Sequence, residues 1–278
     1  MPIVIISSDT YQTGRRIGEM TAKETGYDYV DRDILPPVAE LAGTPEEKLV
    51  RALDEPPSFL GLSSKLRGKV LAHIEEATLG HLLEDNVVCH GLCAHLYVLG
   101  VSHILKVRVL SNPGDFVREV SAQQNTSPEK VMKLLKKQES ERKRWTLGTF
   151  GVDETDPSNY DLVINLNQID PDEAVQTIAR MTTYRKFKPM TYSIKCLRDK
   201  ELACRVRVAL MEDFPDVKVQ ADGTTVIVDT KTVKREKRKR VEAIKALANR
   251  VVGVSYVEVH VVTDILRQAT KAQDKVNV

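Results

Sequence analysis

The sequence predicts an α/β fold, in which a doubly wound parallel sheet is followed by a small α+β domain. Short, largely apolar runs recur along the first two thirds of the chain, as in strands that are buried on both faces of a parallel sheet. Segments with helical periodicity separate these runs, which implies right-handed crossovers. Around 184–189 the pattern changes to paired short strands and a basic helix. The apolar runs lie at 3–6, 87–89, 104–109 and 161–165.

The first domain is expected to open with a strand, a helix and a second strand. Ligands bind at the carboxyl ends of the strands in a doubly wound sheet, so the loop after the first strand lies where a site is expected. A long helix further on carries its apolar residues on one side. The expected elements are a strand at 3–8, a helix at 14–25, a strand at 27–30, a helix from Asp33 to about Ala42, a break at 55–58 and a helix from Ser63 to Glu84.

The second domain is expected to combine two helices with three short strands. The turn at Asp222-Gly223 predicts a hairpin, and the residues that follow it become basic. The elements are a helix at 196–213, strands at 217–221 and 224–229, a helix at 233–249 and a strand at 254–262. The resulting boundaries are a first domain at 1–185, a linker at 186–191, a second domain at 192–265 and a loose tail at 266–278.

The composition is that of an ordinary soluble chain, with 278 residues, 42% of them hydrophobic and 29% charged. No segment is long and apolar enough to cross a membrane, and the start at 1–10 lacks the basic residues of a signal peptide, so a cytoplasmic location is expected. The four cysteines are too scattered for a disulfide framework and are expected to be reduced thiols. The net charge of +2 argues against general nucleic-acid binding.

A phosphate-binding loop is expected between the first strand and the first helix. Such a loop holds an anion with backbone N–H groups at a helix N-terminus, while a lysine neutralises charge and a Ser or Thr hydroxyl holds magnesium. Here Gly14 is kept, Arg15 stands at the lysine position, and Arg16 stands where the magnesium ligand belongs and cannot bind a cation. These residues favour phosphate binding over catalysis. The alternative is a strand-turn-helix that binds no ligand.

Three sequence strings carry a family resemblance. GRRIG at 14–18, YVDRDIL at 29–35 and DPSNYDLVIN at 156–165 resemble the cytidylate-kinase-like family of P-loop proteins, whose members look like nucleoside monophosphate kinases. The resemblance covers about 1–182. It implies a three-layer α/β core, an ATP site at the loop and a monophosphate acceptor site beside the helices that follow the second strand.

The resemblance also implies roles for single residues, and the chain departs from the family pattern at several of them. Residues 11–13 replace small residues of the family loop, and 90–92 lack the arginine that would reach the acceptor phosphate. Compensating charge could come from Arg32 and from 142–144, which fall where the family's lid helix offers arginines over the phosphates. A solvated charged helix at 129–144, with i,i+4 pairs such as Glu139–Lys143, is the alternative.

Acidic, cysteine and histidine residues near the loop admit two interpretations each. Asp31 and Asp33 could hold magnesium or accept a proton, but acids at a helix start also act as caps; we favour the cap for Asp33 and the functional role for Asp31. The cysteines and histidines within 89–103 lack the paired spacing of a zinc site, so no metal site is assigned. The segment 156–159 could contact adenine or form an Asx-type turn.

The second domain carries a separate resemblance and a basic run. The hairpin at 221–226 and the closing segment at 251–257 resemble a BON domain over about 192–264, a module that attaches to lipids or partner proteins. The run at 231–240 could bind a protein or an anionic membrane, since each basic residue near such a surface adds about 1 kcal/mol. A solvated helix face is the alternative. Aromatic residues for base stacking are lacking there, so nucleic acid is not the expected partner.

Two functions follow from these observations. The first is an ATP-dependent phosphotransferase of the cytidylate kinase type, acting on a nucleoside monophosphate or similar small phosphate acceptor, with ATP and Mg²⁺ as cofactors although Arg16 argues against Mg²⁺. The second is a weak or inactive kinase-like scaffold that senses nucleotide and uses its basic BON-like domain to bind a partner or membrane. The residues assigned to catalysis are Arg15, Asp31, Arg142 and Arg144, and those assigned to ATP are Ser8, Thr10, Thr13, Gly14, Arg15, Arg16 and Asn159.

Overall fold

The computed structural model describes residues 2–55 and 61–262. The chain divides into two compact units, Met1–Ile194 and Lys195–Val278, and each is described by itself. The predicted break at 55–58 falls largely outside the described residues, and the predicted tail at 266–278 falls wholly outside them.

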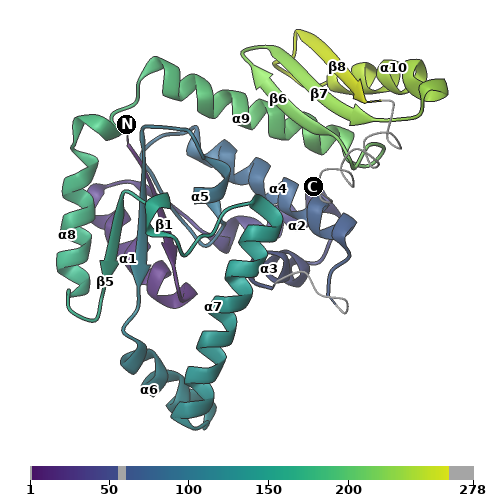
Figure 1. Cartoon of the computed structure of the whole chain (residues 1–278). Helices are drawn as coiled ribbons and strands as arrows, with labels where there is room; N and C mark the ends of the chain where they lie inside the picture. Colours follow the sequence, from purple (N-terminus) through teal and green to yellow (C-terminus); the bar gives the residue numbers. More distant parts are fainter. Residues whose placement is uncertain (1, 56–60, 263–278) are drawn as a thin grey trace, which may run out of the picture. The chain divides into compact units, whose positions relative to one another are not determined.

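A five-stranded parallel sheet forms the centre of the first unit (Figure 1). Its strands lie in the order β2-β3-β1-β4-β5, which confirms the predicted α/β class and the parallel arrangement. All five carboxyl ends therefore meet at one edge. The strands are β1 (Ile3–Ser8), β2 (Asp28–Val30), β3 (Val87–His90), β4 (Ile104–Leu110) and β5 (Leu162–Asn165).

Side chains alternate between the two faces of this sheet. On one face, Val4 and Ile6 of β1 pack with the apolar residues of α1 (Tyr11–Thr25) and α8 (Pro171–Thr182). His90 is in register with Ile6 and shares this face, whereas Arg108 is in register with Ser7 and lies on the opposite one. The remaining helices of the unit are α2 (Leu35–Ala42), α3 (Glu46–Asp54), α4 (Ser64–Leu82), α5 (Ala94–Tyr97), α6 (Pro113–Gln124) and α7 (Pro128–Phe150).

Two helix starts differ from the prediction. The first helix begins at Tyr11 rather than at residue 14, because Gly14 N already donates a helical bond to Thr10 O at 3.2 Å. The helix predicted from Asp33 is a 3-10 turn, Arg32–Ile34, followed by α2. Its cap is Asp31, whose Oδ1 accepts from Asp33 N at 2.9 Å. The prediction that Asp33 is the cap is therefore wrong.

The second unit contains a three-stranded sheet in the order β6-β7-β8. β6 (Lys218–Asp222) and β7 (Thr225–Lys231) form an antiparallel hairpin, and β8 (Tyr256–Val262) pairs with β7 in parallel. Its core combines one face of the sheet with α9 and α10. The helix predicted at 196–213 is α9 (Thr191–Leu210), and the one predicted at 233–249 is a 3-10 turn, Lys234–Glu236, followed by α10 (Lys237–Ala248).

None of the helices within the described residues is long and apolar enough to cross a bilayer.

Candidate functional site

The connection between β1 and α1 is short, since only Asp9 and Thr10 separate the two elements. Ser8 Oγ donates to Thr10 O at 2.8 Å, and Thr10 Oγ1 donates to Thr13 Oγ1 at 2.8 Å. Thr10 makes no side-chain cap to the helix. The N–H groups of residues 11–13 precede the first helical bond, which Gly14 donates. The structure thus brings four of the predicted residues together around the first turn, where an anion would be stabilised.

His90 packs directly against this first turn. Its Nε2 lies 3.1 Å from Ser8 Oγ, and a Cβ atom added to Gly14 would come within 2.1 Å of the same nitrogen. Burial, together with the charge of Arg32, lowers the pKa of His90 to about 3, so the imidazole is neutral at pH 7. Gly14 is required here by packing, independently of any phosphate.

The ring of Tyr11 covers the inner side of the first turn. Its centroid lies 5.1 Å from that of His90, and the guanidinium of Arg32 lies 4.3 Å from the ring centroid. Its hydroxyl donates to Asp31 Oδ2 at 3.0 Å, and burial followed by the charge of Asp31 raises the pKa of Tyr11 to about 12. Because Tyr11 is the first residue of the helix, it cannot form part of a wide loop around a polyphosphate. The exposed side of the turn carries Gln12 and Arg15.

Asp31 is 2% exposed, and both of its carboxylate oxygens accept hydrogen bonds. The Nε of Arg15 lies 3.7 Å from Asp31 Oδ2, but its closer partner is Glu19 at 2.8 Å. Arg16 is exposed. Asp31 and Arg15 are therefore neighbours, as a shared site requires, and Asp31 can accept a proton from a substrate only when Tyr11 releases it.

The two predicted lid arginines have different environments. Arg142 pairs with the buried carboxylate of Glu154, with its Nε 2.5 Å from Oε1 and its Nη2 3.1 Å from Oε2, and it also donates to Leu53 O. Burial would raise the pKa of Glu154, but Arg142 and His95 outweigh it and hold the pKa at about 2. Arg144 is exposed. Arg142 thus joins α7 to the loop at 154 and to α3.

The neighbouring Lys143 pairs with Asp153 at 2.6 Å. The pair Glu139–Lys143, named as an example for the alternative of a solvated charged helix, is therefore not the one that forms. Asp153 lies outside α7, so the charged residues of this helix bind the following loop in addition to meeting solvent.

A second buried cluster was not predicted from the sequence. Arg108 is 6% exposed, and its Nη1 donates to Ser7 Oγ at 3.0 Å and to Tyr160 OH at 3.4 Å. Tyr160 OH also donates to Glu154 O at 2.8 Å. The ring of His95 lies 5.7 Å from that of Tyr160. The available signal was the arginine inside an apolar strand, because a buried charge in such a strand needs a partner.

Comparison with known proteins decides the family of this unit. Residues 3–168, well over half of the chain, match the cytidylate kinase-like family. The chain belongs to this family. Among solved structures, an uncharacterized protein from Eubacterium ventriosum ATCC 27560 is similar over 66% of this chain and 100% of its own, with 15% identity and a TM-score of 0.48.

Two shikimate kinases are also similar in structure to this cytidylate kinase-like chain. The protein from Bacteroides thetaiotaomicron is covered over 99% of its length and 66% of this chain, with 11% identity and a TM-score of 0.43. The protein from Aquifex aeolicus VF5 is covered over 94% and 64%, with 14% identity and a TM-score of 0.32. No curated protein matches the chain.

The remaining predicted residue of the cytidylate kinase-like unit is Asn159. Its Nδ2 donates to Asp153 O at 2.8 Å, and Asp156 Oδ1 accepts from Ser158 N at 2.8 Å. The structure thus forms the Asx-type turn that was the alternative at 156–159. In the part of the chain that the structure describes, no three acidic, histidine or cysteine side chains are grouped to hold a metal ion. With Arg16 at the usual ligand position, the residues present do not fit a protein-bound Mg²⁺.

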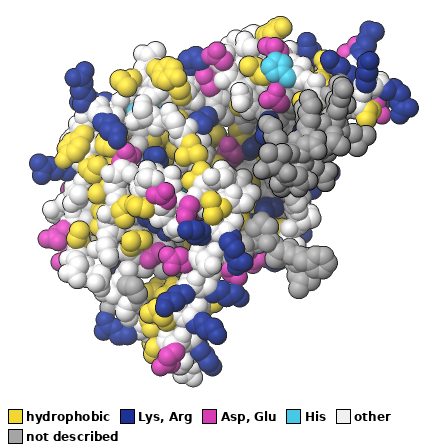
Figure 2. Space-filling model, in the orientation of Figure 1, with side chains coloured by type: hydrophobic (Ala, Val, Ile, Leu, Met, Phe, Trp, Pro, Cys, Tyr) yellow, Lys and Arg dark blue, Asp and Glu magenta, His cyan; other side chains and the backbone are white. Residues whose placement is uncertain are grey.

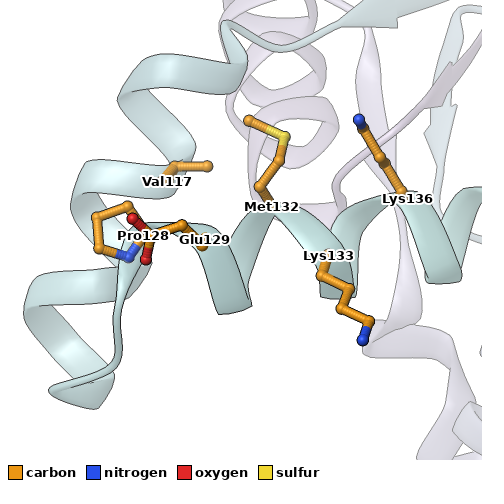
Figure 3. Close-up of a pocket in the computed structure, with 6 residues that line it drawn as sticks. All are labelled: Val117, Pro128, Glu129, Met132, Lys133 and Lys136. Atoms are coloured by element: carbon orange, nitrogen blue, oxygen red, sulfur yellow. The ribbon is translucent and has the colours of Figure 1, made fainter.

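A hollow of about 540 Å³ lies on the hairpin of α6 and α7 (Figure 3). None of the predicted site residues lines it, so it does not enter the phosphate-site argument. Its lining residues are Val117, Pro128, Glu129, Met132, Lys133 and Lys136.

Proposed function

We propose that the cytidylate kinase-like unit is an ATP-dependent phosphotransferase that acts on a nucleoside monophosphate or a similar small phosphate acceptor. The observation that carries the proposal is the first turn of α1, where the N–H groups at 11–13 precede the first helical bond at the carboxyl end of β1. Such amides stabilise anions, and Arg15 adds a positive charge beside them. Membership of the family supports the same class of reaction.

The proposal gives each predicted residue a role. ATP would supply the phosphoryl group. The first-turn amides, the backbone of Gly14 and the hydroxyls of Ser8, Thr10 and Thr13 would hold its phosphates together with Arg15 and the exposed Arg16. No step is assigned to magnesium, because the residues that the structure describes include no group of three side chains that could hold it.

The acceptor side uses the residues around the buried acid. Asp31 would receive the proton of the attacking group after Tyr11 turns away. Arg144, which is exposed on α7, would stabilise the transferred charge, whereas Arg142 would position α7 through Glu154. Asn159 would shape the loop at 153–159 beside an adenine.

The proposal is tested by incubating the purified chain with ATP, Mg²⁺ and a panel of nucleoside monophosphates and measuring ADP. We expect acceptor-dependent ADP that falls by a factor of about 100 or more in Arg15→Ala, since removing one charge-stabilising contact commonly has this effect. Lys23→Ala, near the exposed end of the same helix, is the matched control. ATP-dependent thermal stabilisation without ADP from any acceptor would reject the enzyme in favour of a nucleotide-sensing scaffold.

For the second unit, we propose a BON-like module that contacts anionic phospholipid. Figure 2 shows Lys and Arg side chains gathered at the end of this unit where Figure 1 places α10. Lys231, Lys234, Lys237 and Lys239 are exposed, and none of them has an ion pair with another described residue. We expect co-sedimentation with phosphatidylserine vesicles, lost when Lys234, Lys237 and Lys239 are all changed to Glu and absent with neutral vesicles. Equal sedimentation of the unmodified chain and the triple Lys→Glu variant with phosphatidylserine vesicles would reject this role.

A further inference from the structure

Arg108 carries a buried positive charge that no carboxylate neutralises. The residue is 6% exposed, and across residues 2–55 and 61–262 its hydrogen bonds go only to the hydroxyls of Ser7 and Tyr160. Both bonds use Nη1, so Nε and Nη2 have no partner there. Neither nitrogen is among the described side-chain atoms that are cut off from solvent without a partner, so an anion can reach both, and a guanidinium this shielded is stabilised by one.

The residues around Arg108 do not provide that anion. The buried acid of this cluster, Glu154, is bound by Arg142 through both of its oxygens. Burial lowers the pKa of His95, so this imidazole is neutral and adds no charge, and its Nε2 lies 3.5 Å from Oε2 of the same Glu154. The cluster thus contains two guanidinium groups and one carboxylate, which leaves one positive charge in excess.

We infer that Arg108 forms an anion subsite that takes a phosphate group. Two free nitrogens of one guanidinium present the fork that binds phosphate oxygens in pairs. The Oγ of Ser7 lies beside the fork and can donate to the same group, whereas the hydroxyl of Tyr160 keeps its bond to Glu154 O. A phosphate bound here would supply the negative charge that the cluster of two guanidinium groups and one carboxylate lacks.

The position of Arg108 in the sheet indicates which phosphate it takes, and this step rests on the proposed function. Ser7 and Arg108 are in register near the carboxyl ends of β1 and β4. Ser8, the next residue of β1, faces the opposite side and bonds to Thr10 at the first turn of α1. The first turn would hold the donor phosphates, so the Arg108 subsite on the other face would hold the phosphate of the acceptor.

The subsite is tested by thermal unfolding of the full chain in rising sodium phosphate at constant ionic strength, with sodium acetate as the carboxylate arm. Above the dissociation constant, each tenfold rise in phosphate is expected to shift the unfolding equilibrium about tenfold toward the folded state. The series is repeated in Arg15→Ala, which weakens any binding at the first turn of α1, and the Arg108 variants are compared in that background.

Arg108→Met is the decisive variant. It removes the buried charge, while the hydroxyls of Ser7 and Tyr160 remain hydrogen-bonded to each other at 3.2 Å, so without phosphate its Tm is expected to equal or exceed that of the unmodified chain. Its response to phosphate is expected to disappear, and Arg108→Lys is expected to keep part of it. Arg142→Met, which strands the charge of Glu154, is expected to lower the Tm in every buffer and serves as the structural contrast.

Several results would overturn the inference. The first is a phosphate response that survives in Arg108→Met, and the second is a Tm of Arg108→Met without phosphate that is lower than that of the unmodified chain. The others are failure of both Arg108 variants to fold, and an acetate response as large as the phosphate response. Failure of the proposed function is distinguishable. A phosphate response that depends on Arg108 in a chain that forms no ADP rejects only the kinase, and ADP formation without that response rejects only the subsite.

Discussion

The imidazole of His90 lies against the backbone of Gly14, so that a Cβ atom on residue 14 would come 2.1 Å from Nε2 of His90 and 2.2 Å from Ser8 Oγ. Gly14→Ala is therefore expected to destabilise the first unit by about 1–3 kcal/mol through overpacking, despite the higher helix propensity of alanine. Gly68→Ala is the matched control, because residue 68 also lies inside a helix and a Cβ there meets nothing within 4 Å. Urea unfolding measures both; equal stability changes would contradict the contact.

Buried His90 also makes stability depend on pH. The unfolded chain binds a proton below about 6.5, whereas the folded pKa is about 3. Stability is thus fully present above pH 6.5 and is lost as pH falls toward 3, by about 1.4 kcal/mol per pH unit from this group. Denaturant unfolding between pH 7 and 5 should show a smaller loss in His90→Gln than in His81→Gln, the control near the end of α4. Identical pH slopes would show that His90 is not buried in its neutral form.

Glu154 is expected to be the most sensitive acid of the first unit. Glu154→Gln leaves the guanidinium of Arg142 without its carboxylate and should cost about 3–5 kcal/mol. Because the folded pKa is about 2 against an ordinary 4.5, the contribution of Glu154 is present above pH 4.5 and is lost as pH falls to 2. Glu139→Gln, an exposed acid of α7, should leave the urea midpoint unchanged. A Glu154 variant as stable as this control would refute the network.

In the second unit, two arginines of α10 should contribute differently to the free energy of unfolding. Arg240 donates to Thr230 Oγ1 at 2.8 Å, pairs with Asp216 and stacks 4.9 Å from the ring centroid of Phe214, so Arg240→Ala should cost about 1–2 kcal/mol. Arg238 is exposed and pairs only with Glu242 four residues on, so Arg238→Ala should leave the stability of the unit unchanged. Circular dichroism during chemical unfolding distinguishes the two variants. Equal losses would mean that the contacts of Arg240 with Thr230, Asp216 and Phe214 contribute nothing.

The strands and their order of occurrence were predictable, because continuous apolar segments such as Val87–Cys89 have few other solutions in a doubly wound sheet. The start of α1 was not, since residues 11–13 contain no residue that stops a helix and the family spacing placed them in a loop. The cap at Asp31 was not predictable either, because it depends on where the turn after β2 begins. A start two residues later fits the hydrophobic pattern of the sequence equally well.

The Arg108 cluster could not be predicted for a different reason. Its partners, Tyr160 and Ser7, lie 52 and 101 positions away in the chain, so no local spacing connects them. The same holds for Arg142, whose surface-like position on a charged helix hides its contact with Leu53, 89 positions away. Charged residues of this kind are recognisable only when the fold shows which of them bond to distant parts of the chain.

The claim on which the function depends is that the first turn of α1 still binds polyphosphate although Tyr11 belongs to the helix. Titration calorimetry of ATP into the full chain tests it most directly, with Arg15→Ala as the comparison. We expect saturable heat with about one site in the unmodified chain and a dissociation constant raised about tenfold or more in the variant, which corresponds to about 1.4 kcal/mol. No heat at millimolar ATP, or the same affinity in both chains, would contradict the account.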